Sequence, residues 1–286
     1  MSFELSEKIN LGKVVINVHD LWNMLTFYQE KLGLDVLESS DHHALLGIKK
    51  DGSELLELRV SNAKPNTEPH TGLYHIAFLL PTRRDLANIL FSLITQKNVD
   101  IQGASDHGYS EAIYLTDPEG NGIEIYRDKP KEEWTILEDG TIPGVTVPMD
   151  GNGVLAEKDE GVHDHMPNGT VIGHIHLMVS DIKESIDFYR NVIGLELKFN
   201  AGSSAAFMAA GEYHHHVAMN VWSTDKAVPI KDGDLGIVYY TIEVNDQAEF
   251  EEMKSHVRQT IELTDVTEQS FKMFDPNGIG IKVTLA

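Results

Sequence analysis

Hydrophobic and polar residues alternate along the short segments 14–18 and 174–179, and alternation with a period of two predicts β-strands. Each of these strands runs into an aspartate, Asp20 or Asp181, a residue type that favours the position just before a helix. Amphipathic stretches of helical period follow both aspartates, and several strand-like segments follow each stretch. The pattern therefore predicts two modules in which one strand, one helix and then further strands succeed one another.

The same order of elements occurs two more times. Strand-like segments at 73–80 and 237–244 each precede a helical pattern, and each module ends in a hairpin around an Asp-Pro turn, at Asp117 and Asp275. Other motifs repeat with constant spacing: Val-x-Asp, Phe-Tyr and Gly-Leu of the first half recur 161 residues later, and the Asp-Pro turn recurs 158 residues later. A constant register over several motifs indicates two copies of a unit of about 120 residues.

These repeats predict how the chain is divided. We expect an α+β fold built from four modules of the form β-α-β-β-β. The modules are expected at residues 12–60, 72–127, 172–222 and 235–285. The first two form an N-terminal unit, 1–127, and the last two form a C-terminal unit, 171–286. Between the units, residues 128–170 contain ten acidic residues, three lysines and four of the ten prolines, which predicts a mostly irregular linker with a solvated acidic surface.

Composition excludes several classes of protein. The 286 residues include 45 Asp and Glu against 23 Lys and Arg, a formal net charge of −22, and such a surface repels nucleic-acid backbones and anionic membranes. There is no cysteine, which excludes disulfides, thiolate zinc sites, iron–sulfur clusters and cysteine nucleophiles. No apolar run is long enough to span a membrane and the first residues lack a signal-peptide pattern, so we expect a cytoplasmic protein.

The 14 histidines are then the main source of chemistry. His174 and His176 share one face of a predicted strand, an arrangement that suits a metal better than a hydrophobic core. His75 lies in the most apolar strand-like segment, where a core histidine and a metal ligand are both open interpretations. Glu124 lies between two isoleucines, so that its carboxylate is on the face opposite to them.

A run of three histidines, His214-His215-His216, opens a further strand-like segment. In a strand, His214 and His216 point to one side and His215 points to the other. For His214 and His216, a polar strand end and a binding role are both open interpretations.

Two features carry a resemblance to a known family. The repeated module resembles the vicinal oxygen chelate superfamily of glyoxalases, bleomycin resistance proteins and extradiol dioxygenases. Residues 107–124 resemble the extradiol signature, with a histidine, an apolar-Tyr pair, an Asp-Pro-x-Gly turn and a glutamate. With Gly-His-Ile-His at 173 and Tyr-His-His-His at 213, most of the chain is similar to catechol 2,3-dioxygenases of the bacillus type. The resemblance implies that the four modules close into two barrels.

The resemblance also implies an iron(II) site made by two histidines and one glutamate. The family places its ligands on the first and last strands of two modules. The equivalent first-strand positions here are Lys13, His75, His174 and Tyr239, and the last-strand positions are Glu124 and Lys282. The second and third modules thus retain the complete set His75, Glu124 and His174, whereas the family usually places iron in its third and fourth modules. The second and third modules would then pair, within one chain or across a dimer.

Some assignments stay open within this set. Mn(II) or another divalent metal also fits two histidines and a carboxylate. His176 is the alternative ligand to His174, although support of His174 is the role we expect for it.

Roles for the surrounding residues follow from the same resemblance. His215 would stabilise dioxygen and act as acid–base catalyst, while His107 and Tyr114 would bind the substrate oxygens and steer proton transfer. Further candidates for contact with the substrate are His176, His214 and His216. The implied reaction is extradiol cleavage of a small aromatic diol by O₂ in aromatic catabolism, and the implied assembly is a homodimer or homotetramer.

Two other functions would use the same fold. A glyoxalase-like lyase, isomerase or thiol transferase would need Zn, Ni, Co or Mn and often a fourth protein ligand, which could come from residues 214–220. A protein that only sequesters a small aromatic compound has little need for metal ligands, so the complete set argues against it.

Overall fold

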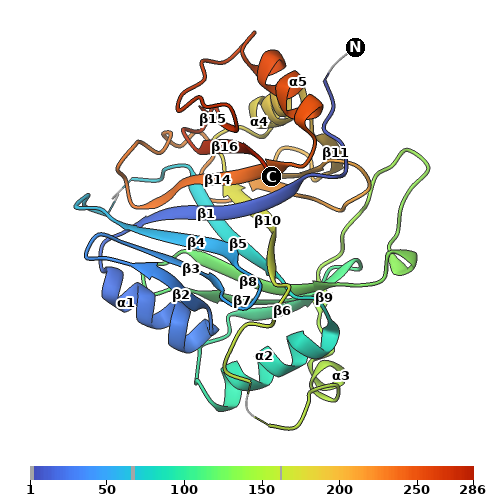
Figure 1. The fold of residues 1–286 in the computed structure, drawn as a ribbon. Coiled ribbons are helices and arrows are strands. Elements are labelled where there is room, and N and C mark those ends of the chain that lie inside the picture. The colour runs from blue at the N-terminus through green and yellow to red at the C-terminus, as the bar shows by residue number, and fades with distance from the viewer. Residues whose placement is uncertain (1–2, 66–67, 162) are drawn as a thin grey trace.

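The computed structural model describes residues 3–65, 68–161 and 163–286, and it shows the predicted strand–helix–strand modules (Figure 1). The first comprises β1 (Asn10–Val18), α1 (Leu21–Thr26), η1 (Phe27–Leu32), β2 (Asp35–Ser39), β3 (His43–Ile48) and β4 (Ser53–Val60). The second comprises β5 (Gly72–Leu79), α2 (Arg83–Thr95), β6 (Gly103–Asp106), β7 (Ser110–Thr116) and β8 (Gly122–Asp128).

The second half of the chain repeats this order. The third module comprises β10 (Val171–Met178), α4 (Ile182–Phe188), η3 (Tyr189–Ile193), β11 (Glu196–Asn200), β12 (Ala205–Ala209) and β13 (Val217–Asn220). The fourth comprises β14 (Gly236–Val244), α5 (Gln247–Val257), β15 (Ser270–Phe274) and β16 (Gly280–Leu285). An isolated bridge between Thr264 and Lys272 stands where the other modules have a further strand. The predicted α+β fold with four modules is confirmed.

Local chemistry sets the ends of the helices in the first and third modules. The carboxylates of Asp20 and Asp181 accept hydrogen bonds from backbone N–H groups three residues later, at 3.0 and 2.8 Å, as the capping pattern predicted. Helices α1 and α4 continue as π-helical turns, η1 and η3, which end at Gly33 and Gly194. These glycines have φ of 84° and 88°, a conformation that favours glycine over other residues.

Strand pairing joins each module of the N-terminal unit to a module of the C-terminal unit. Strand β1 of the first module pairs antiparallel with β14 of the fourth, and β5 of the second pairs antiparallel with β10 of the third. A short contact between β1 and β10 links the two pairs, as seen in the centre of Figure 1. The second and third modules therefore pair within one chain.

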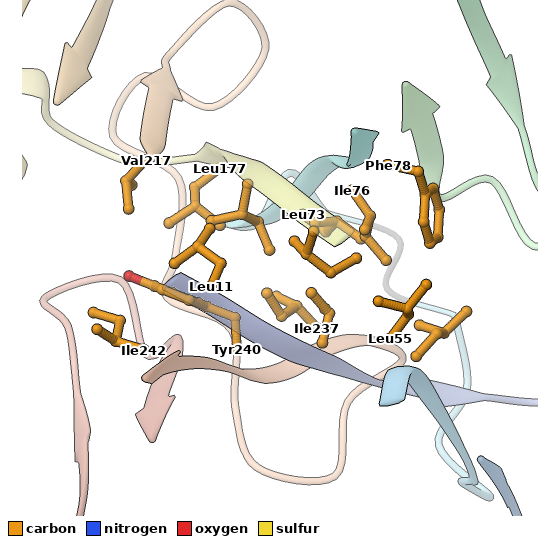
Figure 2. Packing of buried hydrophobic residues seen from close by; sticks show 14 of the residues in the cluster. Leu11, Leu55, Leu73, Ile76, Phe78, Leu177, Val217, Ile237, Tyr240 and Ile242 are labelled. Carbon is orange, nitrogen blue, oxygen red and sulfur yellow. The ribbon is translucent and has the colours of Figure 1, made fainter. Parts of the chain in front are cut away.

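The main hydrophobic core lies between these two pairs of strands. Leu11 of β1 and Ile237 and Tyr240 of β14 face Leu73 of β5 and Leu177 of β10 (Figure 2). All five side chains are at most 7% exposed, so burial of apolar surface from all four modules holds the two pairs together.

The linker between β8 and β10 is largely irregular but contains three short elements. These are η2 (Lys131–Glu133), β9 (Val147–Pro148) and α3 (Gly151–Leu155). Strand β9 pairs with β6, and α3 packs against α2, so the linker is fastened to the second module before the third begins. Among the described residues, no helix has the length and apolar character needed to cross a membrane.

Candidate metal centre and cavity

Four neighbouring strands place their side chains on one common face. Across β7, β8, β5 and β10, the register aligns Tyr114, Glu124, Ala77 and His174. Two residues before Ala77, His75 stands opposite His176 of β10. Because side chains two residues apart in a strand point to the same face, these two adjacent rows bring His75, Glu124 and His174 together.

The three side chains converge at distances that fit a metal ion. Nε2 of His75 and Nε2 of His174 are 3.3 Å apart, and they lie 3.0 and 3.2 Å from Oε2 of Glu124. Ligands about 2.1 Å from a metal are separated by about 3.0 Å at right angles and about 3.4 Å in a tetrahedron. Two imidazole nitrogens and one carboxylate oxygen at this spacing can hold a divalent transition metal.

Burial sets the electrostatics of this cluster. Burial alone would raise the pKa of Glu124, but its ion pairs and hydrogen bonds with His174 and His75 outweigh burial and hold that pKa well below its ordinary value. Burial lowers the pKa of His174 to about 4, although Glu124 opposes the shift. Near neutral pH, the cluster therefore offers an ionised carboxylate beside a neutral imidazole, the protonation states that bind metals.

Small residues leave room for the large ones in the two rows. Gly122 of β8 lies opposite His75, and a Cβ at Gly122 would be 2.1 Å from the carbonyl oxygen of Tyr74 and 3.0 Å from Cβ of His75. In the next row, Ala77 lies between Glu124 and His174. These positions keep the space above the sheet free for the three converging side chains.

His176 has a different environment from His174. Nδ2 of Asn220 donates a hydrogen bond to Nε2 of His176 at 3.0 Å, because an amide N–H₂ can only donate. The ring packs at 4.8 Å from His75 and 4.9 Å from Tyr74. Its Nε2 is thus occupied by Asn220, which favours His174 as the ligand and His176 as a packing partner of His75.

His107 and Tyr114 form a hydrogen-bonded pair beside the cluster. Nε2 of His107 lies 2.6 Å from the hydroxyl oxygen of Tyr114, and its Nδ1 lies 2.8 Å from the carbonyl oxygen of Val145 in the linker. A carbonyl only accepts, so Nδ1 carries the proton and the Tyr114 hydroxyl donates to Nε2. Burial and the charge of Glu124 raise the pKa of Tyr114, which keeps its proton in place.

The three consecutive histidines do not form a strand, because β13 begins only at Val217. The prediction of a strand is therefore wrong for this run, but the predicted sides fit: His214 and His216 both pack against Tyr213, and His215 lies on the cavity side. His215 packs 4.3 Å from His174, between ring centroids, and lines the cavity described below. His214 bonds to Asp128 and lies behind His215, and His216 lines a separate hollow near Glu7 and Lys131. Neither His214 nor His216 is among the residues that line this cavity together with His75, Glu124 and His174, which we call the triad.

A cavity of about 320 Å³ opens over the triad. Its polar end is formed by the three converging side chains together with His107, Tyr114, His176 and His215. Its walls are mainly aromatic and apolar: Tyr74, Tyr109, Val145, Phe199, Phe207 and Trp222. Gly144 and Thr146 of the linker close one side. This lining suits a small, mostly apolar molecule that carries a few polar atoms.

In the first and fourth modules, the equivalent positions hold Lys13, Tyr239 and Lys282, and further cations lie close to them. Lys13 lies 2.9 Å from Glu54 and 3.4 Å from Glu57. Arg59 and Lys272 lie 5.5 and 5.2 Å from the ring centre of Tyr239. Lysine and tyrosine stand where the other pair has histidine and glutamate, so among the described residues this pair of modules lacks the donor set of the other pair.

Comparison with known proteins agrees with the repeated module. The family model of the Glyoxalase/Bleomycin resistance protein/Dioxygenase superfamily matches residues 10–125 and 171–283. The chain belongs to this superfamily. Within the superfamily, it is 38% identical over 276 residues to the catechol-2,3-dioxygenase of Bacillus subtilis strain 168, covering 95% of each chain.

Solved structures show the same superfamily fold. Glyoxalase I from Zea mays aligns over 97% of this chain and 92% of its own, with 16% identity and a TM-score of 0.56. The cppA protein from Streptococcus pneumoniae TIGR4 aligns over 97% of this chain and 100% of its own, with 13% identity and a TM-score of 0.57. At this identity the two structures support the fold alone.

Several residues around the site were not predicted from the sequence. Asn220 and Asp128, which bond to His176 and His214, lie at the ends of strands, where a polar residue carries no particular signal. The linker residues that close the cavity lie in an irregular segment. Asp128 does share a face of β8 with Glu124 by the period of two, so alternation in this strand predicts that both carboxylates point to the same side.

Proposed function

We propose that this protein is an iron(II)-dependent extradiol dioxygenase that opens the ring of a catechol. The observation that carries the proposal is the placement of two histidines and one carboxylate at the polar end of an aromatic cavity, with His215 and the His107–Tyr114 pair on its rim. The relative from Bacillus subtilis carries the name of this activity. The reaction needs no further reductant, since both atoms of O₂ enter the product.

Iron(II) held by His75, Glu124 and His174 would have open coordination positions and would supply the Lewis acidity and redox chemistry that O₂ requires. The chain itself provides binding, orientation and proton transfer around that position. Mn(II) fits the same donor set, so the metal is part of the proposal.

Tyr114 is suited to orient the diol. Its proton points to Nε2 of His107, so the lone pairs of its oxygen are available to accept a hydrogen bond from a substrate hydroxyl. His107 is anchored to the linker through Val145, and therefore it holds the Tyr114 hydroxyl in one direction. One hydroxyl of the diol would be positioned in this way.

His215 is suited to move a proton. Its Nδ1 faces His214 at 2.8 Å, which leaves Nε2 as the nitrogen available to a molecule in the cavity. Burial and the neighbouring histidines lower the pKa of His215 well below its ordinary value, so that it is neutral near pH 7. Nε2 would take a proton from the second hydroxyl and return it to the opened product.

The aromatic walls would hold the ring and exclude water. Phe207 packs 5.1 Å from His215, and Trp222 packs 5.2 Å from Tyr74, between ring centroids. A ring placed between such walls gains apolar burial and stacking. Exclusion of water also strengthens the electrostatic interactions at the polar end.

The test is oxygen uptake by protein loaded anaerobically with iron(II), on addition of catechol. We expect uptake of one O₂ for each catechol and a yellow ring-opened product. Glu124→Ala is the matched negative variant, since it removes one ligand and leaves the walls intact. Metal bound at one ion per chain, without uptake with catechol or alkylcatechols, would refute the proposal and favour a glyoxalase-like reaction.

A further inference from the structure

A chain of hydrogen bonds leads from the cavity to the end of β8. Nδ1 of His215 lies 2.8 Å from Nδ1 of His214, and Nε2 of His214 lies 2.9 Å from Oδ1 of Asp128. Asp128 is the last residue of β8 and lies on the same face of that strand as Glu124. One strand thus supports both the triad and the histidine run.

The carboxylate of Asp128 accepts the last hydrogen bond of this series, and it indicates which nitrogen donates in each bond. A carboxylate only accepts, so Nε2 of His214 carries a proton and donates it to Asp128. The arrangement inferred here has Nδ1 of His214 as the acceptor and Nδ1 of His215 as the donor of their hydrogen bond. The remaining nitrogen of His215, Nε2, is left without a proton on the side of the cavity.

The ring of His214 is held rigidly. It stacks on Tyr109 at 4.3 Å with an interplanar angle of 13°, and Tyr213 covers it at 4.1 Å. Its side chain is 0% exposed, while that of Asp128 is 22% exposed. These contacts keep the imidazole in one plane, with Nε2 toward Asp128 and Nδ1 toward His215.

Asp128 is oriented by a second set of hydrogen bonds. The Tyr213 hydroxyl lies 2.9 Å from Oδ2 of Asp128, and the Tyr126 hydroxyl lies 2.8 Å from that of Tyr213. Tyr213 donates to the carboxylate and therefore accepts from Tyr126. Both oxygens of Asp128 thus have a partner, and its carboxylate is fixed relative to His214.

We propose that Asp128 and His214 are positioning residues that lock His215 in the tautomer with a proton on Nδ1 and an unprotonated Nε2 facing the cavity. The inference rests on the proposed function for its catalytic consequence, but the tautomer itself is a property of the folded chain. Without the lock, a neutral His215 can carry its proton on Nε2, where it blocks acceptance of a proton from the diol. His214 thus acts through His215 without touching the substrate.

The experiment compares His214→Phe with His216→Phe. Each variant replaces one buried imidazole of the same run by a ring, but only His214→Phe removes the acceptor for His215 Nδ1. The tautomer of His215 is measured from ¹⁵N shifts of its ring in protein loaded with diamagnetic Zn(II). We expect the Nδ1–H tautomer in the wild type and in His216→Phe, and a shift toward Nε2–H in His214→Phe.

Kinetics of the iron(II)-loaded proteins give the second readout. We expect kcat for catechol to fall at least ~100-fold in His214→Phe, the size of an acid–base contribution, with KM and iron content within about threefold of the wild type, because the cavity walls are unchanged. His216→Phe should keep wild-type kcat. Asp128→Ala should shift the tautomer in the same direction as His214→Phe.

The outcomes separate the two proposals. A wild-type His215 with its proton on Nε2 would overturn the positioning inference, as would unchanged kcat in a folded His214→Phe variant of an active enzyme. The expected tautomers in a protein that consumes no O₂ with any catechol would uphold the lock and refute the dioxygenase function.

Discussion

Substitution of Gly122 by alanine tests how closely the metal centre depends on the spacing of its strands. The added Cβ would lie 2.1 Å from the carbonyl oxygen of Tyr74 and 3.0 Å from Cβ of His75. The first contact involves backbone of the paired strand β5, which cannot move away without disturbing its ladder with β8. We therefore expect a loss of about 1–3 kcal/mol in the free energy of unfolding, as for other overpacked positions.

The chain offers a matched control for this variant. Gly280 of β16 stands opposite Tyr239 of β14, in the same relation as Gly122 to His75, and its added Cβ would lie 2.5 Å from the carbonyl oxygen of Val238 and 2.8 Å from Cβ of Tyr239. Gly280→Ala should cost a similar free energy of unfolding. It lies in the pair of modules without the triad, so it should leave metal binding unchanged.

Metal affinity distinguishes the two variants. A shift of a few tenths of an ångström at Cβ of His75 exceeds the tolerance of about 0.2 Å that ligand distances allow, so we expect Gly122→Ala to weaken metal binding at least ~10-fold, or about 1.4 kcal/mol. The assays are urea unfolding of the metal-free proteins and competition of each with a chelator for iron(II). Equal metal affinities in the two variants would refute the spacing argument.

Three further predictions concern single groups of the site and the core. Tyr114→Phe should lower kcat/KM for catechol about 2–10-fold at unchanged metal content, since a hydrogen bond between neutral groups contributes about 0.5–1.5 kcal/mol. Steady-state kinetics would show an unchanged value if Tyr114 does not contact the diol. The cavity has neither lysine nor arginine among its described lining residues. We therefore expect at least ~100-fold lower kcat/KM for 3,4-dihydroxybenzoate than for catechol, because the carboxylate would lose its water without gaining a partner. Equal values would contradict the apolar character of the walls. Burial raises the pKa of Asp275 to about 6, although hydrogen bonds from Ile279 and Asn277 oppose the shift. The contribution of Asp275 to the free energy of unfolding is therefore complete below its unfolded pKa of about 3.9, and it is lost as the pH rises through 6. Unfolding free energies from pH 4 to 7 should therefore fall by up to about 2–3 kcal/mol relative to Asp275→Asn, and parallel profiles of the two proteins would contradict this assignment.

Much of the fold could be predicted because it depends on local periodicity and on the repeat, whereas the donor set followed from the resemblance to extradiol dioxygenases. The aspartate caps are local features, and they occur where the pattern indicated. Alternation in single strands also placed Glu124 opposite its neighbouring isoleucines and His174 on one face with His176, and the structure brings Glu124 and His174 together with His75. The prediction of a strand was wrong for the run 214–216, because β13 begins only at Val217.

Local patterns could not predict which strands pair over long distances in the sequence. His75 and His174 are 99 residues apart, and neither strand indicates whether its partner belongs to the same chain. The support given to His215 by Asp128 depends on how the end of β8 meets a turn of the third module. Contacts of this kind depend on the packing of several elements, which hydrophobic periodicity does not report.

The nested pairing of the modules has a consequence for synthesis on the ribosome. In the inner pair, the last residue of β10 is synthesised 99 residues after the end of β5. In the outer pair, the last residue of β14 is synthesised 226 residues after the end of β1. At roughly 5–20 residues per second, these intervals are about 5–20 s and about 11–45 s. The nascent chain can therefore assemble all three metal ligands while one edge of its first strand is still open, and during that interval the apolar face of β1 is the part of the chain most in need of protection from aggregation.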